Sequence, residues 1–193
     1  ATFELYSSVS IARFDFKDNL KQYISSNLVF GTFITTIFYI FCLIFHTFIE
    51  QTLMIDFLTL NIMFIYLLVY PSTQMLQIEK QINHEYKIVV AISFLSSFLS
   101  TITSIVLVLL LKDRLLGRIM GHFIPLILVS LFVYIWIIKD GFKISKEYYT
   151  YALKVSLPLI IHLLAGYLLS SSDKIMITKM VSTEANALYS VSY

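Results

Sequence analysis

Cysteine, charge and the motifs of soluble enzymes are scarce in this chain. Cys42 is the only cysteine among 193 residues, which excludes disulfides and cysteine-based metal sites within the chain. Charged residues make up 13%, against about 25% in soluble domains, and hydrophobic residues 58%, against about 45–50%. Neither the two-histidine spacing of a zinc protease nor the Gly-Lys-Ser/Thr of a phosphate loop is present. The composition predicts a membrane protein and argues against a metal site, ATP coupling or a nucleic-acid partner.

Long runs without Asp, Glu, Lys or Arg predict an all-α fold, a polytopic transmembrane helix bundle. About 20 residues of apolar helix cross the ~30 Å hydrocarbon core of a bilayer. Five such runs occur: Tyr23–Ile49, Phe57–Ile78, Ile88–Leu111, Ile119–Ile138 and Val155–Ser172. A further apolar segment begins at Ala187, so we expect the chain to be an excerpt of a larger transporter.

The fifth run is the shortest, and two interpretations of its end are open. Its apolar pattern resumes at Ile175 and reaches Met180, which favours one long helix with Asp173 and Lys174 inside the span. The alternative ends the helix at Ser172 and places the two charges at the membrane interface. Charged side chains at bilayer depth normally face a bundle interior or a water-filled cavity.

Lysine and arginine are distributed unequally over the two ends of the predicted spans. Nine lie on one side and at most five on the other, and the richer side of a membrane protein is usually cytoplasmic. We therefore expect residues 1–21, 77–87 and 139–154 to be cytoplasmic. The segment Lys139–Tyr151 is the longest polar connection and the best candidate for a boundary between two lobes.

A polar row on the fifth helix predicts a passage or polar interface. Pro158, His162, Gly166, Ser170 and Lys174 recur at every fourth position and so share one helix face. Aliphatic residues occupy other faces: Leu157, Leu164, Leu168 and Ile175. Lining a cavity is the functional interpretation of this row, whereas Asp173 and Lys174 would alternatively form structural ion pairs with other helices or lie at the interface.

Small residues in the third and fourth spans indicate close helix packing. Ser96, Ser100 and Ser104 share one row, and Gly117 and Gly121 open the following span. Such spacing lets two helices approach closely and hydrogen-bond. A hydroxyl track for sugar or ions is the alternative for the serines. Arg118, between the glycines, would either extend to the lipid headgroups or meet an anionic substrate.

The stretch from Leu157 resembles the seventh-helix region of Wzx-type O-antigen and polysaccharide flippases, in the multidrug/oligosaccharidyl-lipid/polysaccharide exporter superfamily. The matching residues are Leu157-Pro158-Leu159-Ile160, His162, Gly166, Ser170-Ser171-Ser172-Asp173-Lys174-Ile175-Met176-Ile177 and Tyr189-Ser190-Val191. Ile161, Lys174 and Ala187 replace a Pro, an Arg and a Gly of the family pattern. Weaker similarities extend along the rest of the chain: Ser10–Phe14 with Asp15, Lys17 and Asp18; Glu79–Tyr86; and Gly117–Gly121.

The resemblance implies a fragment of a two-lobe flippase with six or more helices per lobe and a central cavity that opens alternately to either side. Residues 1–138 would end the N-terminal lobe (the tail of helix two and helices three to six), 139–154 would be a cytoplasmic inter-lobe linker, and 155–193 would start the C-terminal lobe (helix seven and the start of helix eight).

The implied activity is transport of undecaprenyl diphosphate-linked oligosaccharide across a bacterial inner membrane, with no bond made or broken and no cofactor. Cavity candidates are Lys174, Asp173, Arg118, Arg13, Ser170 and His162. Expected partners are the lipid-linked oligosaccharide, membrane lipids, a coupling proton or sodium ion, and a polysaccharide polymerase. The alternatives are a drug/cation antiporter of the same superfamily, or a membrane-embedded glycan transferase or polymerase, for which His46, Glu50 and Asp56 are the best but weak candidates.

Overall fold

The computed structural model describes residues 5–53 and 56–192, without the side chains of residues 48, 51–53, 170, 183, 187, 191 and 192. In these ranges the regular structure is helical throughout. The elements are α1 (Ser8–Asp15), the 3-10 helix η1 (Lys17–Asn19), α2 (Leu20–Ile44), α3 (His46–Leu53), α4 (Phe57–Ile82), α5 (Tyr86–Leu110), α6 (Arg114–Gly141), α7 (Lys146–Met180) and α8 (Thr183–Ser192).

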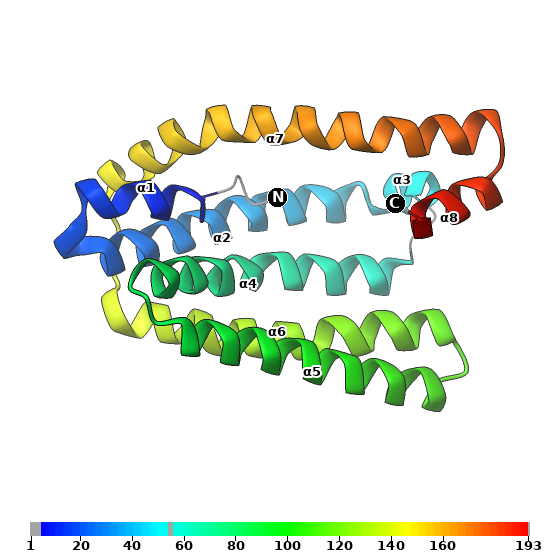
Figure 1. Ribbon diagram of the computed structural model, residues 1–193, viewed down its shortest axis with the longest axis horizontal. Helices are drawn as coiled ribbons and strands as arrows, with labels where there is room; N and C mark the ends of the chain where they lie inside the picture. The colour runs from blue at the N-terminus through cyan, green and yellow to red at the C-terminus, as the bar shows by residue number, and fades with distance from the viewer. Residues whose placement is uncertain (1–4, 54–55, 193) are drawn as a thin grey trace.

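The long helices run up and down, each antiparallel to the next along the chain (Figure 1). One end of the bundle carries α1, η1, the α4–α5 turn and the α6–α7 connection, and we call it the α4–α5 end. The opposite end carries α3, α8 and the α5–α6 connection, and we call it the α5–α6 end. Figure 1 shows α7 along one side of the bundle and the α5–α6 pair along the other, with α2 and α4 between them.

The prediction of five apolar spans in an all-α bundle is confirmed. Helices long and apolar enough to cross a membrane occupy Lys17–Ile44, Phe57–Ile82, Tyr86–Leu110, Arg114–Gly141 and Lys146–Met180. The longer version of the fifth helix is also confirmed, since α7 continues without a break through Asp173 and Lys174 to Met180. Whether these two residues lie at bilayer depth remains a prediction.

The predicted end of the first span, Ile49, is wrong. Helix α2 stops at Ile44, and α3 begins at His46 after a single residue, Phe45, with φ −101° and ψ 22°. The break leaves carbonyl groups without their usual helical donors. The ring nitrogen Nδ1 of His46 lies 3.0 Å from the carbonyl oxygen of Leu43 and gives one of them a partner. Composition could not show this break because the apolar run continues across it.

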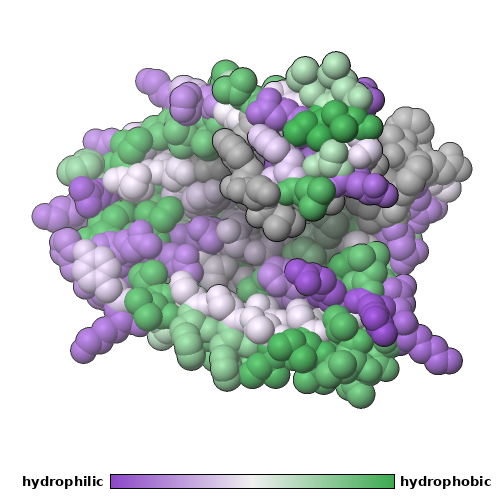
Figure 2. Space-filling view, turned by 45° about the vertical axis from the view of Figure 1, so that its right-hand side comes forward, coloured by the Kyte–Doolittle hydropathy of each residue, from purple (hydrophilic) through white to green (hydrophobic). Residues whose placement is uncertain are grey.

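The larger buried core lies at the α4–α5 end and joins α1, α2, α4, α6 and α7. Its fully buried members include Val9, Tyr23, Met75, Val133 and Ala152. A smaller cluster of Cys42, Leu60 and Phe64 joins α2 to α4 farther along the bundle. Elsewhere, large apolar side chains reach the surface, as the green areas in Figure 2 show. Such a surface suits a hydrocarbon environment better than water.

The segment predicted as a linker, residues 139–154, is largely helical. Helix α6 extends to Gly141 and α7 starts at Lys146, so residues 142–145 alone connect them. Aromatic rings attach the first turns of α7 to the end of α1 and to α2: the ring centroid of Tyr148 lies 5.2 Å from that of Phe16, which follows α1, and 5.7 Å from that of Tyr23 on α2. This contact holds the start of α7 firmly against the bundle. The role of the segment as a boundary between lobes stays a prediction.

Candidate functional site

Helices α5 and α6 are in close backbone contact at Gly117 and Gly121. A Cβ atom added to Gly121 would lie 2.4 Å from the Cα of Ser104, and one added to Gly117 would lie 2.7 Å from the carbonyl oxygen of Leu107. Thr103 Oγ1 donates a hydrogen bond to the Gly121 carbonyl oxygen at 2.5 Å. The two helices are therefore fixed in register by contacts that only glycine permits at these positions.

Beside this contact is an open pocket of about 550 Å³ between α5 and α6. Its polar wall consists of the hydroxyl groups of Ser100, Thr101 and Ser104 from α5 and the side chains of Arg118 and His122 from α6. The remaining lining residues are apolar: Ile105, Leu115, Ile119 and Phe123. Among the residues that the structure describes, no Asp or Glu lines the pocket, and no ion pair involves Arg118. The pocket therefore has a cation and an imidazole without a neighbouring carboxylate.

The pocket extends inward from the α5–α6 end of the bundle. Arg118 comes four residues after the start of α6 and His122 eight residues after it, which corresponds to roughly 6 and 12 Å along the helix at ~1.5 Å per residue. The two side chains lie one turn apart on the same face. A guanidinium, an imidazole and hydroxyl groups can bind a phosphate or carboxylate. The aliphatic walls beside them suit a hydrocarbon chain, so the pocket fits an anionic amphiphile.

The serine row on α5 has mixed surroundings. Ser100 is buried and its hydroxyl donates to the Ser97 carbonyl oxygen at 3.1 Å. Ser96, which is half-buried, donates likewise to the Ile92 carbonyl oxygen at 2.7 Å. These hydroxyls are thus held within their own helix, and Ser100 and Ser104 also line the pocket. Both interpretations of the row, close packing and contact with a polar ligand, remain predictions.

The polar row of α7 lies on a helix that is largely exposed beyond Ser156, where Ile160, Ser171, Ser172 and Ile177 are half-buried. Pro158, His162, Gly166 and Lys174 are exposed, and the side chain of Ser170 lies outside the described residues. The aliphatic residues between them are exposed as well, for example Leu164 and Leu168. A Cβ atom added to Gly166 would have no neighbouring atom within 4 Å, apart from the adjacent residues and the backbone of its own helix. Pro158, His162, Gly166 and Lys174 are therefore not covered by another described helix.

The structure does not bring the three candidate cations together. Lys174 is on α7 and Arg118 on α6, at opposite sides of the bundle (Figure 1). Neither Lys174 nor Asp173 has an ion-pair partner within the described part of the chain. Arg13 is near the α4–α5 end, in a separate open pocket of about 390 Å³ that is also lined by Lys17 and Asn83. Each cation thus belongs to a different surface.

Two residues in the pockets of the structure, His122 and Glu79, are not among the site residues that the sequence predicts. His122 follows Arg118 by four residues, and this spacing places the two side chains on one helix face. Glu79 belongs to the segment 77–87 that is expected to be cytoplasmic, and the structure places it inside α4, where it is buried. Its spacing of three from Leu76 and seven from Ser72 places the three residues on one helix face, and the structure buries all three.

The helix lengths, the apolar surface and the buried glycine contact together define a multi-pass α-helical membrane protein. The chain belongs to the polysaccharide biosynthesis protein family, whose sequence model matches residues 3–193. The comparisons with curated proteins and with solved structures gave no match. The family links this membrane protein to polysaccharide synthesis.

Proposed function

We propose that this chain is part of a flippase that moves polyprenyl diphosphate-linked oligosaccharide from the cytoplasmic to the outer leaflet of a bacterial inner membrane. The family match over residues 3–193 carries this proposal. On this account the chain contributes to a larger two-lobe, alternating-access transporter that makes and breaks no covalent bond and needs no cofactor.

The distribution of cations supports the proposal independently. The lipid diphosphate carries negative charge, so it must meet polar or cationic groups on both sides of the membrane while its prenyl chain stays in hydrocarbon. Arg13 and Lys17 line a pocket at the α4–α5 end, and Arg118 and His122 line one toward the α5–α6 end. The pocket beside Arg118 combines these groups with aliphatic walls, which matches a lipid that carries phosphate.

A drug/cation antiporter of the same superfamily is less consistent with this arrangement. A cationic drug would require carboxylates in its binding site, and the described lining of the Arg118 pocket contains none. A glycan transferase or polymerase would require converging acid and base groups at one membrane face. His46 lies against the Phe57 ring and the Leu43 carbonyl oxygen, which gives it no described acidic partner.

Genetic complementation tests the proposed activity. The full-length protein should restore surface glycan in a bacterial strain that lacks its own flippase, with glycan normalised to the amount of protein in the membrane. Resistance to cationic drugs without restored glycan would favour the antiporter. A newly formed glycan–lipid bond in purified reactions would favour the transferase.

The proposed orientation has its own test. Lys146→Cys and Glu50→Cys, each in a Cys42→Ala background, should react with a membrane-impermeant thiol reagent from opposite sides, with residue 146 cytoplasmic. Reaction of both positions from the same side would overturn the assignment of the α4–α5 end to the cytoplasm.

A further inference from the structure

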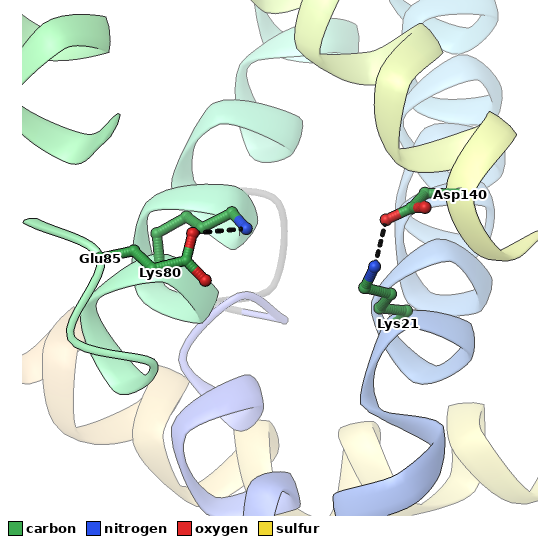
Figure 3. A network of polar contacts seen from close by, with 4 residues as sticks. All are labelled: Lys21, Lys80, Glu85 and Asp140. Carbon is green, nitrogen blue, oxygen red and sulfur yellow. Dashed lines mark hydrogen bonds and ion pairs between the residues drawn. The ribbon is translucent and has the colours of Figure 1, made fainter. Parts of the chain in front are cut away.

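Around Glu79, at the α4–α5 end of the bundle, lie two lysines and two further carboxylates. Figure 3 shows two ion pairs there: Lys21 Nζ lies 2.6 Å from Asp140 Oδ2, and Lys80 Nζ lies 3.0 Å from Glu85 Oε2. Glu79 lines a small cavity of about 20 Å³ together with Lys21, Lys80 and Asp140. Two ammonium groups thus face three carboxylates.

Glu79 is the carboxylate without a partner. It is only 6% exposed, whereas the side chains of Asp140 and Glu85 are 49% and 43% exposed. Neither a hydrogen bond nor an ion pair joins the Glu79 carboxylate to any residue that the structure describes. The cavity also has apolar walls, formed by Ile24, Leu76, Trp136 and Ile137. Burial disfavours the ionised form of a carboxylate that has no partner.

We propose that Glu79 is a proton-binding site and that it carries its proton while Lys21 is paired with Asp140 and Lys80 with Glu85. A proton removes the unpaired charge without needing additional space. The cavity holds at most about one water, and two ammonium groups line it. A sodium ion would need several oxygen ligands and would be repelled by both ammonium groups, which is why we assign the site to a proton.

Release of the proton would change the ion pairs between the helices. The charged groups that act on Glu79 are Lys80 on its own helix, Lys21 on α2, Asp140 on α6 and Glu85 in the α4–α5 turn. When Glu79–COOH gives its proton to water, the new carboxylate attracts the Lys21 ammonium, and the exposed Asp140 carboxylate can be solvated instead. A link between α2 and α6 is then exchanged for a link between α2 and α4. If the proposed function holds, this proton is a candidate for the coupling ion of transport.

Carbodiimide labelling tests the site without relying on transport. Dicyclohexylcarbodiimide is an apolar reagent that modifies protonated carboxyl groups, and the full-length protein in lipid nanodiscs would be labelled across pH 5–9. Cleavage after Lys80 and Lys139 places Glu79, Glu85 and Asp140 on three different peptides for mass spectrometry. We expect an adduct on Glu79 whose yield falls about tenfold for each pH unit above its midpoint, as for release of one proton. Absence of an adduct on Glu79 at every pH, or equal labelling of Asp140, would overturn the proposal.

Two variants and one salt series sharpen the test. Asp140→Asn frees Lys21 to pair with Glu79 and should lower the labelling of Glu79 at neutral pH, whereas the control Glu147→Gln, an exposed carboxylate at the start of α7, should leave it unchanged. Unchanged labelling of Glu79 in Asp140→Asn would refute the proposed exchange of Lys21 from Asp140 to Glu79.

A salt series tests the identity of the bound ion. Protection of Glu79 from labelling by sodium chloride but not by potassium chloride at fixed pH would refute the assignment of the site to a proton. Because no readout here is transport, a failure of the flippase proposal leaves these outcomes interpretable.

Discussion

Helices α6 and α7 each carry a cation in a long apolar helix, but their surroundings differ. Arg118 on α6 has α5 beside it, which supplies three hydroxyl groups and an apolar wall. Both cations are exposed, but Lys174 has no such neighbour, because α7 packs against α1 and α2 only near its start, where Tyr148 and Ala152 are buried. A cation in an apolar helix thus becomes part of a pocket only where a neighbouring helix is held close, and glycine at the contact is what allows that.

The largest effect is expected from the glycines on these two helices. Gly121→Ala places a Cβ 2.4 Å from the Cα of Ser104, so the backbones of α5 and α6 must move apart. Overpacking of this kind typically costs about 1–3 kcal/mol, and we expect a clear loss of monodisperse protein in size-exclusion chromatography after detergent extraction.

Gly166→Ala on α7 is the matched control. No neighbouring atom lies within 4 Å of the added methyl group, and alanine favours a helix over glycine by about 0.5–1 kcal/mol. We expect a normal or slightly increased yield. Equal losses for the two substitutions would mean that the close contact between α5 and α6 does not exist in the membrane.

The second prediction concerns the guanidinium of Arg118. Arg118→Met should lower glycan export about 10–100-fold, the factor that corresponds to losing a hydrogen bond to a charged group worth about 1.5–3 kcal/mol. Arg118→Lys should retain part of the activity because the charge remains, although the planar fork is lost. The measurement is surface glycan in the flippase-deficient strain at equal membrane levels of the protein.

Arg114→Met provides the control for this prediction. Arg114 lies one turn earlier on the same helix and is exposed like Arg118, but it does not line the pocket. Its replacement should change export by less than about twofold, as is usual for surface charges worth ~0–1 kcal/mol or less. A similar loss for both arginines would point to general attraction of anionic lipid at this end of the bundle.

The difference between these helices also shows what sequence can and cannot predict. The five spans follow from runs that lack charge, because desolvating a charge overrides other preferences in a membrane. The continuation of α7 through Asp173 and Lys174 was indicated by the apolar residues after them. Gly117 and Gly121 indicated a close helix contact beside Arg118, but the sequence did not show that Lys174 lacks a described neighbouring helix, because that depends on packing between distant segments.

Burial of Glu79 and the pocket position of His122 illustrate the same point at the level of single residues. A charge next to the end of an apolar run usually belongs to a solvated turn, and Glu85, which lies in the α4–α5 turn with its side chain 43% exposed, follows that rule. Glu79 does not, because α4 extends to Ile82 and α2 and α6 cover that face. The end of a helix is the feature that composition predicts least accurately.

A smaller effect is expected for Lys174. Its row on α7 predicts contact with a substrate phosphate, yet no described residue surrounds it, so part of its charge would be solvated. Lys174→Met should lower export by up to about tenfold, or ~1.4 kcal/mol, with insertion into the membrane unchanged, and Lys174→Arg should retain export. Export equal to that of the wild type in Lys174→Met would remove this residue from the mechanism and leave Arg118 as the principal cation.

The smallest effect is expected for Ser100, where the pocket and the helix contact meet. Its hydroxyl already donates to the Ser97 carbonyl oxygen at 3.1 Å. Ser100→Ala should therefore leave both the yield and the export within about threefold of the wild type. This factor corresponds to the ~0.6 kcal/mol average for hydrogen bonds between membrane helices. Ser100→Leu is apolar like Ser100→Ala, but it adds three carbon atoms beyond the alanine methyl group at a buried position. It should therefore lower the folded yield or fill the pocket. Measured at equal protein levels, a strong loss of export in Ser100→Ala would identify the hydroxyl as a direct ligand of the substrate and would make the serine row of α5 part of the transport path.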